Sequence, residues 1–209
     1  MGSAKEALYH HVDAIRESFQ LSPFEPLNVI HLLEAYDRFD VTAQDFKNPG
    51  LCGIAFAGEK VDTILLNKHR TPIEQNFDCG HELLHLSKHR NKQAHYCLTY
   101  AQGQQNSFLE WEANEGSAQL IIPYQDFIPR FLTYFNHPDT SSSYSIQDKL
   151  AAHYGVTAQV INIRINSLSY EIDQYCNGVP LQEIQLLSRR QLKKRGITPT
   201  HYSALCDFG

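Results

Sequence analysis

Residues 77–86 read FDCGHELLHL and contain the pattern His-Glu-x-x-His, from which the expected fold and function of the chain follow. In a helix with about 3.6 residues per turn, His81 and His85 lie one above the other on a single face. Two neutral imidazoles at this spacing can bind one zinc ion, and Glu82 lies beside them as a base for a water proton. The chain has 11 histidines among 209 residues. Taken alone, the motif therefore has a plain alternative, an amphipathic helix with two surface histidines.

A helix is predicted around this motif. Thr71 suits the N-cap, and Pro72 suits the first helical position, where a backbone N–H has no helical partner in any case. Apolar residues recur at helical intervals as far as Leu86, and the pattern ends in the polar run at 88–92. The two histidines are thus expected on a helix that also carries an apolar stripe.

A short β region is predicted before this helix. Residues 52–56 form an apolar strand, Gly58-Glu59 a tight turn, and residues 61–66 a returning strand. We expect an antiparallel hairpin, joined by a short strand near Val41. The predicted fold class is α+β, with a small antiparallel sheet packed on a core built around the HExxH helix.

Further amphipathic helices are predicted on both sides of this core. The spacing of apolar residues indicates them over residues 5–19, 26–36, 108–122 and 127–135. Residues 93–107 are polar and predict a loop over the site. Within that loop, His95, Tyr96 and Tyr100 are candidates to stabilise an oxyanion, with local packing as the alternative for each.

A linker is predicted at residues 137–143, which are rich in turn formers and lack large apolar side chains. The chain is therefore expected to divide into a first domain over residues 1–136 and a small helical domain over residues 141–209.

The second domain has the pattern of a helix-turn-helix. Residues 146–154 and 157–168 are amphipathic and are joined at Gly155. If this pair bound DNA, the later helix would read the bases. Acidic neighbours nearly balance its cations, so we favour packing or partner docking over DNA binding. A last helix is expected over residues 180–196.

The composition argues against several other classes. The net charge is −5 and the pI is about 6.1, so no basic field draws the chain onto nucleic acid or anionic lipid. No apolar run has transmembrane length, and the N-terminus lacks the plan of a signal peptide. The five cysteines are odd in number and form no CxxC pair, which argues against a disulfide framework. We expect a cytoplasmic protein with reduced thiols and no membrane partner.

A zinc ion held by two histidines needs a third protein ligand, with one position left open for water. The predicted helix at 108–122 offers Glu110 and Asn114, one turn apart on a face that is otherwise small or apolar. A carboxylate on such a face needs a partner, which zinc would supply, and Asn114 is placed to orient a histidine ligand. The alternative is a glutamate stabilised by the helix dipole, which suits Glu112 and Glu115 better than Glu110.

In order and spacing, these elements resemble the ImmA/IrrE-type metallo-endopeptidases of bacteria, phages and mobile elements. That family has a strand ending in Asn, a HExxH helix and a segment of the form E-x-x-A-N-x-F-A-x-x-L-L-x-P. The matching residues here are Ile64–Asn67, the HELLH run at 81–85, Glu110–Asn114 and 120–123. The resemblance covers residues 25–125 and has a weaker echo in the helix-turn-helix pattern.

The resemblance implies a zinc metallopeptidase domain over residues 1–136. It implies Zn²⁺ bound by His81, His85 and Glu110, with Glu82 as the general base. It also implies a protein substrate, typically a helix-turn-helix repressor whose cleavage induces a mobile element or a stress response.

Two other function classes remain open at the level of sequence. One is a zinc-containing interaction module that binds a repressor without cleaving it; the retained Glu82 favours hydrolysis instead. The other is a DNA-binding regulator whose peptidase-like half only senses, and the nearly neutral second half of the chain disfavours it.

Overall fold

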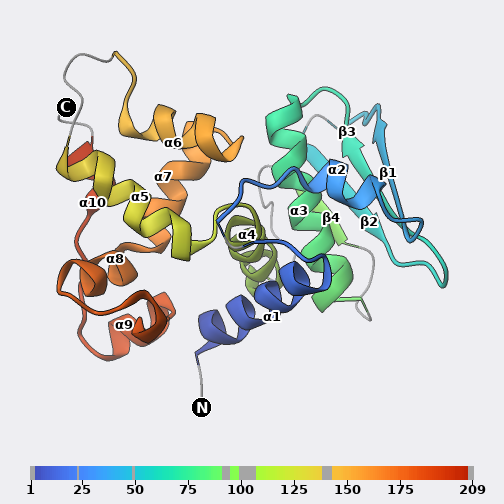
Figure 1. Ribbon diagram of the computed structural model, residues 1–209. Helices are drawn as coiled ribbons and strands as arrows, with labels where there is room; N and C mark the ends of the chain where they lie inside the picture. The colour runs from blue at the N-terminus through green and yellow to red at the C-terminus, as the bar shows by residue number, and fades with distance from the viewer. Residues whose placement is uncertain are drawn as a thin grey trace. The chain divides into compact units, whose positions relative to one another are not determined.

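The computed structural model describes residues 3–22, 24–48, 50–90, 95–98, 107–137 and 143–206. Helices and strands are mixed, and the chain divides into two compact units (Figure 1). Pro26–Ile121 form one, here named the sheet unit, and Met1–Glu25 together with Ile122–Gly209 form the other, the helical unit. The predicted α+β class is confirmed.

These units differ from the predicted division at residues 137–143. α1 (Ala4–Ser18) and α5 (Tyr124–Asn136) belong to the same unit as the C-terminal helices. α1 joins them through Lys5, whose Nζ lies 2.8 Å from Oε1 of buried Glu171. Sequence periodicity shows that a helix has an apolar face but does not show which partner covers it. The unit to which α1 belongs therefore depends on contacts that are distant in sequence.

The sheet unit contains four strands among the described residues. They are β1 (Phe39–Gln44), β2 (Leu51–Phe56), β3 (Asp62–Asn67) and β4 (His95–Leu98). Their order is β1-β3-β2-β4 (Figure 1). β2 pairs antiparallel with β3 as the predicted hairpin, and the predicted strand near Val41 exists as β1.

The prediction of an antiparallel sheet is wrong for one pair, because β1 and β3 run parallel. β3 lies between β1 and β2. Once the tight turn makes β3 antiparallel to β2, which itself runs opposite to β1, β3 must run parallel to β1. β4 also departs from the predicted loop at 93–107; four residues in a polar stretch are too short for a periodic signal.

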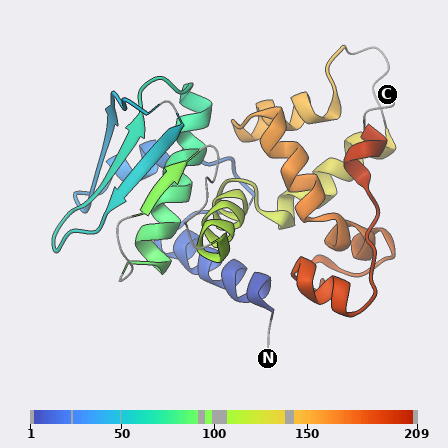
Figure 2. The same ribbon diagram turned by 180° about the vertical axis from the view of Figure 1, so that it is seen from behind.

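α3 (Pro72–Lys88) lies between the sheet and α4 (Ser107–Ile121), as Figure 2 shows from behind. Its first turn is fixed by a capping box, in which Thr71 accepts the backbone N–H of Glu74 and the glutamate accepts that of Thr71. The shorter α2 (Val29–Glu34) packs against α3 and β1.

Asn67, the last residue of β3, connects the end of this strand to its surroundings. Its side-chain amide donates to the carbonyl of Leu51, and its oxygen accepts the N–H of His69. The backbone carbonyl of Asn67 accepts from the side chain of Gln75 on α3. A buried asparagine at this point therefore ties the strand end to a neighbouring strand, to the following turn and to the helix.

α4 approaches α3 closely at Gly80. A Cβ atom built on Gly80 would lie 2.5 Å from Oγ of Ser117 and 3.4 Å from Cδ1 of Ile121. The Ser117 hydroxyl donates to the carbonyl of Phe77 on α3, 3.0 Å away. The absence of a side chain on one helix thus allows a hydrogen bond from the other. This contact lies two turns from Glu110 along α4 and sets the distance between the two helices.

The helical unit consists, in its described part, of α1, α5 and a series of shorter helices. They are α6 (Ile146–Tyr154), α7 (Ala158–Ser167), α8 (Ser169–Cys176), the 3-10 turn η1 (Leu181–Glu183), α9 (Arg189–Lys194) and α10 (Tyr202–Cys206). α6 ends at Gly155, whose φ of 62° is left-handed and favours glycine. The helix-turn-helix-like character of this region stays a prediction. The predicted helix at 180–196 is wrong as one element, because Ser188 caps a separate helix.

Arg164 of α7 is fully buried in this unit. Its Nη1 donates to the hydroxyl of Tyr9 at 2.7 Å, and its Nε donates to the carbonyl of Ile122 at 3.2 Å. A cation in that position joins α7 to α1 and to the backbone just before α5, and it is not available to a phosphate. The burial of Arg164 thus agrees with a packing role for α7.

We predict that Gly80→Val lowers Tm by several degrees, because overpacking a closely packed helix contact costs about 1–3 kcal/mol. Ser87→Val is the matched control, since Ser87 is an exposed position of the same helix. Thermal unfolding of both variants followed by circular dichroism measures the difference. Equal Tm values for the two variants would contradict the close contact at Gly80.

Candidate functional site

Three side chains converge between α3 and α4. Nε2 of His81 and Nε2 of His85 lie 3.0 Å apart. Oε2 of Glu110 lies 3.4 Å from Nε2 of His81, and Oε1 of Glu110 lies 3.5 Å from Nε2 of His85. Both histidines are buried, and all three donor atoms lie within 4.8 Å of one another.

This arrangement fits a divalent metal ion. Ligand atoms about 2.0–2.1 Å from a tetrahedral zinc ion lie about 3.3 Å from one another. The two histidine nitrogens lie 3.0 Å apart, and each lies 3.4 or 3.5 Å from one of the two Glu110 oxygens, which is close to this spacing. Two imidazole nitrogens and one carboxylate oxygen are ligands that zinc accepts, and three protein ligands leave a fourth position open. Sequence reasoning named the same three residues.

Asn114 lies one turn beyond Glu110 on α4 and contacts the other side of the His81 ring. Its Oδ1 is 3.0 Å from Nδ1 of His81. An amide oxygen accepts only, so His81 Nδ1 carries the proton and Nε2 keeps its lone pair toward the cluster. The structure thus places Asn114 where the sequence predicted it, beside a histidine of the motif.

Glu82 is fully buried between α3 and β2. Neither of its carboxylate oxygens has a hydrogen-bond partner among the described residues. A Cβ atom on Gly53 of β2 would lie 3.1 Å from both Cγ and Oε1 of Glu82, so a side chain at this position would crowd the carboxylate. Burial raises the pKa of Glu82 to about 8, while nearby His81 acts in the opposite direction. A buried polar group without a hydrogen-bond partner costs about 1–3 kcal/mol unless a ligand, a water or a cation satisfies it.

Comparison with known protein families decides the affiliation of the chain. The family model Peptidase_M78, described as IrrE N-terminal-like domain, matches residues 34–166, more than half of the sequence. The chain belongs to the Peptidase_M78 family. The resemblance to ImmA/IrrE-type proteins is thereby confirmed, and membership makes the chain a metallopeptidase-type protein. No curated protein matches the chain.

Membership in Peptidase_M78 agrees with the position of the cluster, since His81, His85 and Glu110 all lie in the matched segment. A peptidase acts on a protein substrate. No helix in the described part of the chain combines the length and apolar character needed to cross a membrane.

Sequence reasoning missed two residues next to the cluster, His89 and Glu112. Nδ1 of His89 lies 3.0 Å from Nδ1 of His85, and its Nε2 lies 2.9 Å from Oε2 of Glu112. Glu112 is buried, and besides His89 it contacts Lys88, whose Nζ lies 3.4 Å from its Oε1. The available signal was the spacing of four residues from His85 to His89, which repeats the spacing of the motif.

The candidates for oxyanion stabilisation cannot be placed in the site. Tyr100 lies outside the described residues. For His95 and Tyr96 the structure describes the backbone of β4 and not the side chains.

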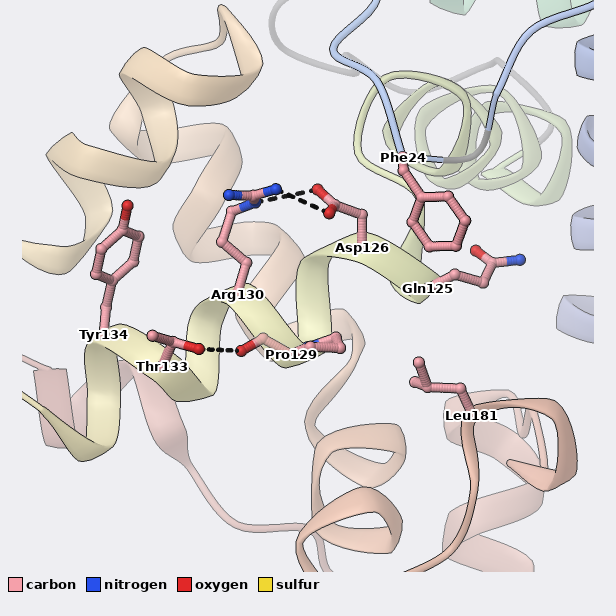
Figure 3. Close-up of a pocket in the computed structure, with 8 residues that line it drawn as sticks. All are labelled: Phe24, Gln125, Asp126, Pro129, Arg130, Thr133, Tyr134 and Leu181. Carbon is pink, nitrogen blue, oxygen red and sulfur yellow. Dashed lines mark hydrogen bonds and ion pairs between the residues drawn. The ribbon is translucent and has the colours of Figure 1, made fainter.

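A surface pocket in the helical unit follows one side of α5 (Figure 3). It is lined by Phe24, Gln125, Asp126, Pro129, Arg130, Thr133, Tyr134 and Leu181. The carboxylate of Asp126 is engaged by Arg130 through Nε at 3.1 Å and Nη2 at 2.9 Å. The lining contains neither histidine nor cysteine and its one carboxylate is paired, so it lacks the ligands of a metal site.

We predict that the protein binds one divalent ion and that Glu110→Gln weakens its binding by more than about 100-fold, beyond the loss expected for an outer partner. The amide keeps the size of the side chain but removes the charge. Glu59→Gln, a change in the exposed turn between β2 and β3, is the matched control. Competition with a chelator of known affinity measures the dissociation constants, and equal values for the two variants would rule out Glu110 as a ligand.

Proposed function

We propose that this chain is a zinc-dependent endopeptidase that cleaves a regulatory protein, with Glu82 as the general base. The observation that carries the proposal is the bare, buried carboxylate of Glu82 beside a cluster of three metal-ligand side chains. A purely structural metal site needs no such base, and an apolar residue in its place would avoid the cost of burial.

In this proposal, His81, His85 and Glu110 hold Zn²⁺, and Asn114 orients His81 through its Nδ1–H. Bound zinc would supply Lewis acidity, which polarises a peptide carbonyl and lowers the pKa of water. The family membership supports a metal-dependent hydrolase, and the donor set supports zinc as that metal.

Glu82 moves the proton. Its carboxylate accepts a proton from the attacking water and donates it to the leaving amine when the peptide bond breaks. Burial raises the pKa of Glu82, and a neighbouring zinc ion would keep the carboxylate ionised and able to accept that proton. Gly53 leaves the space in which this carboxylate lies.

An extended segment of the substrate is proposed to pair with β4. β4 is the edge strand beside β2 among the described strands, and β2 contacts Glu82 through Gly53. Addition of a strand to a sheet edge uses backbone hydrogen bonds and tolerates many sequences. It would present the scissile bond close to the base.

The substrate is proposed to be a helix-turn-helix repressor in the cytoplasm, on the basis of the resemblance to ImmA/IrrE-type proteins. α6 and α7, the helix-turn-helix-like part of the chain, are proposed to dock a partner and not DNA, since Arg164 is buried. The alternative is a zinc-containing module that binds the repressor without cleaving it. The two differ only in whether Glu82 is needed after binding.

We predict that Glu82→Gln keeps zinc and partner binding but slows cleavage by about 10²–10⁴-fold, the usual contribution of a positioned general base. The amide has the size of the carboxylate but is a far weaker base. Newly formed N-termini in a lysate of the source cells, compared after treatment with wild type and with Glu82→Gln, identify the cleaved protein. The purified candidate then gives the rates.

Zinc content of Glu82→Gln measured beside these rates separates the possibilities. A zinc-loaded variant that cleaves as fast as wild type would overturn the role of Glu82. If zinc-loaded wild type produced no new N-terminus in any repressor but bound one tightly, the binding module would replace the peptidase.

A further inference from the structure

His89 and Glu112 lie in line behind His85, on the side away from the cluster. His89 ends α3, and its backbone N–H donates to the carbonyl of His85 at 2.9 Å. The His89 ring is buried, and its centroid lies 5.1 Å from that of the His85 ring. One ring nitrogen lies 3.0 Å from Nδ1 of His85 and the other 2.9 Å from Oε2 of Glu112. A continuous chain of hydrogen bonds therefore runs from α4 to His85.

The direction of the protons in this chain follows from Glu112. An ionised carboxylate only accepts, so Nε2 of His89 must be the N–H donor. A neutral imidazole has a single N–H, which leaves Nδ1 of His89 as an acceptor. The hydrogen bond to His85 can then form only if His85 carries its proton on Nδ1. Nε2 of His85 is left with a lone pair, and this is the nitrogen that faces His81 and Glu110.

Glu112 is held in place for this task. Its second oxygen, Oε1, lies 3.4 Å from Nζ of Lys88, so each oxygen of this carboxylate contacts a side chain of its own. Glu112 is two residues from Glu110. The same turn of α4 therefore carries one of the three clustered side chains and the acceptor at the end of this series of hydrogen bonds.

We propose that Glu112 and His89 are positioning residues that fix the tautomer and the ring orientation of His85 as a metal ligand. The inference rests on the metal site of the proposed function and not on hydrolysis. His81 is oriented by a different device, the amide of Asn114. A histidine ligand whose second nitrogen is held in this way is a better-oriented and more basic ligand, and loss of such a partner typically weakens metal binding by about 10–100-fold.

The experiment measures binding of Co²⁺ and Zn²⁺ alone, by chelator competition and, for cobalt, by the visible absorption spectrum. His89→Leu removes the acceptor, and we expect metal affinity to fall by about 10–100-fold with an altered cobalt spectrum. His89→Asn keeps an acceptor oxygen near the position of Nδ1, so it should bind within a few-fold of wild type, as an estimate from the retained hydrogen bond. His69→Leu is the control, because His69 is exposed and pairs with Asp45 instead.

Glu112→Gln distinguishes positioning from general stabilisation. In wild type it should weaken metal binding by about tenfold, since a neutral amide no longer dictates which nitrogen of His89 carries the proton. In the His89→Asn background it should have no further effect, because the asparagine oxygen is an acceptor whatever Glu112 does. Thermal unfolding of each metal-free variant reports folding separately.

Each result bears on a single claim. Wild-type affinity and an unchanged cobalt spectrum in Glu112→Gln would overturn the inference, and so would equal losses from Glu112→Gln in both backgrounds. These readings hold even if His89→Leu does not fold. A wild-type protein that binds neither metal would overturn the proposed metal site itself, which is a different outcome from variants that bind as wild type does.

Discussion

The close approach of α4 to α3 is the constraint on which the candidate site depends. At Gly80 the absence of a side chain lets Ser117 reach the backbone of α3. With the helices held at that distance, one face of α4 supplies Glu110 to the cluster and Asn114 to His81. Glu112, from the same helix, reaches the far side of the motif through His89. α3 thus carries the two histidines, and α4 carries the third member of the cluster together with the proposed positioning groups.

The buried carboxylate of Glu82 needs both space and a partner for its charge. The carboxylate lies against β2, where Gly53 leaves space for it, and has no hydrogen-bond partner among the described residues. Left alone in such a place, a carboxyl group takes up a proton, which agrees with a pKa raised to about 8. A cation held by the neighbouring ligands would favour its ionised form. In the proposed metal site, the ion would thus offset the unfavourable burial of Glu82.

The sequence allowed the motif helix, the hairpin and the third member of the cluster to be predicted, because each depends on local spacing. Residues four apart on a helix share a face, so His81 with His85 and Glu110 with Asn114 could be grouped without a structure. The parallel pairing of β1 with β3, the strand β4 and the placement of α1 with the C-terminal helices depend on contacts distant in sequence. The contact of Glu112 with His89 was missed for the same reason, since His89 lies at the end of a different helix. Periodicity shows which residues share a face but not what that face meets.

The measurement that tests this account most directly is the X-ray absorption spectrum of the zinc-loaded protein at the zinc edge. Ligation by His81, His85 and Glu110 predicts a first shell of nitrogen and oxygen atoms at about 2.0–2.2 Å, with the outer scattering typical of two imidazole rings. Glu110→Gln should alter that shell, whereas Glu59→Gln should not. A sulfur shell at about 2.3 Å, or a spectrum without imidazole scattering, would contradict the metal centre between α3 and α4.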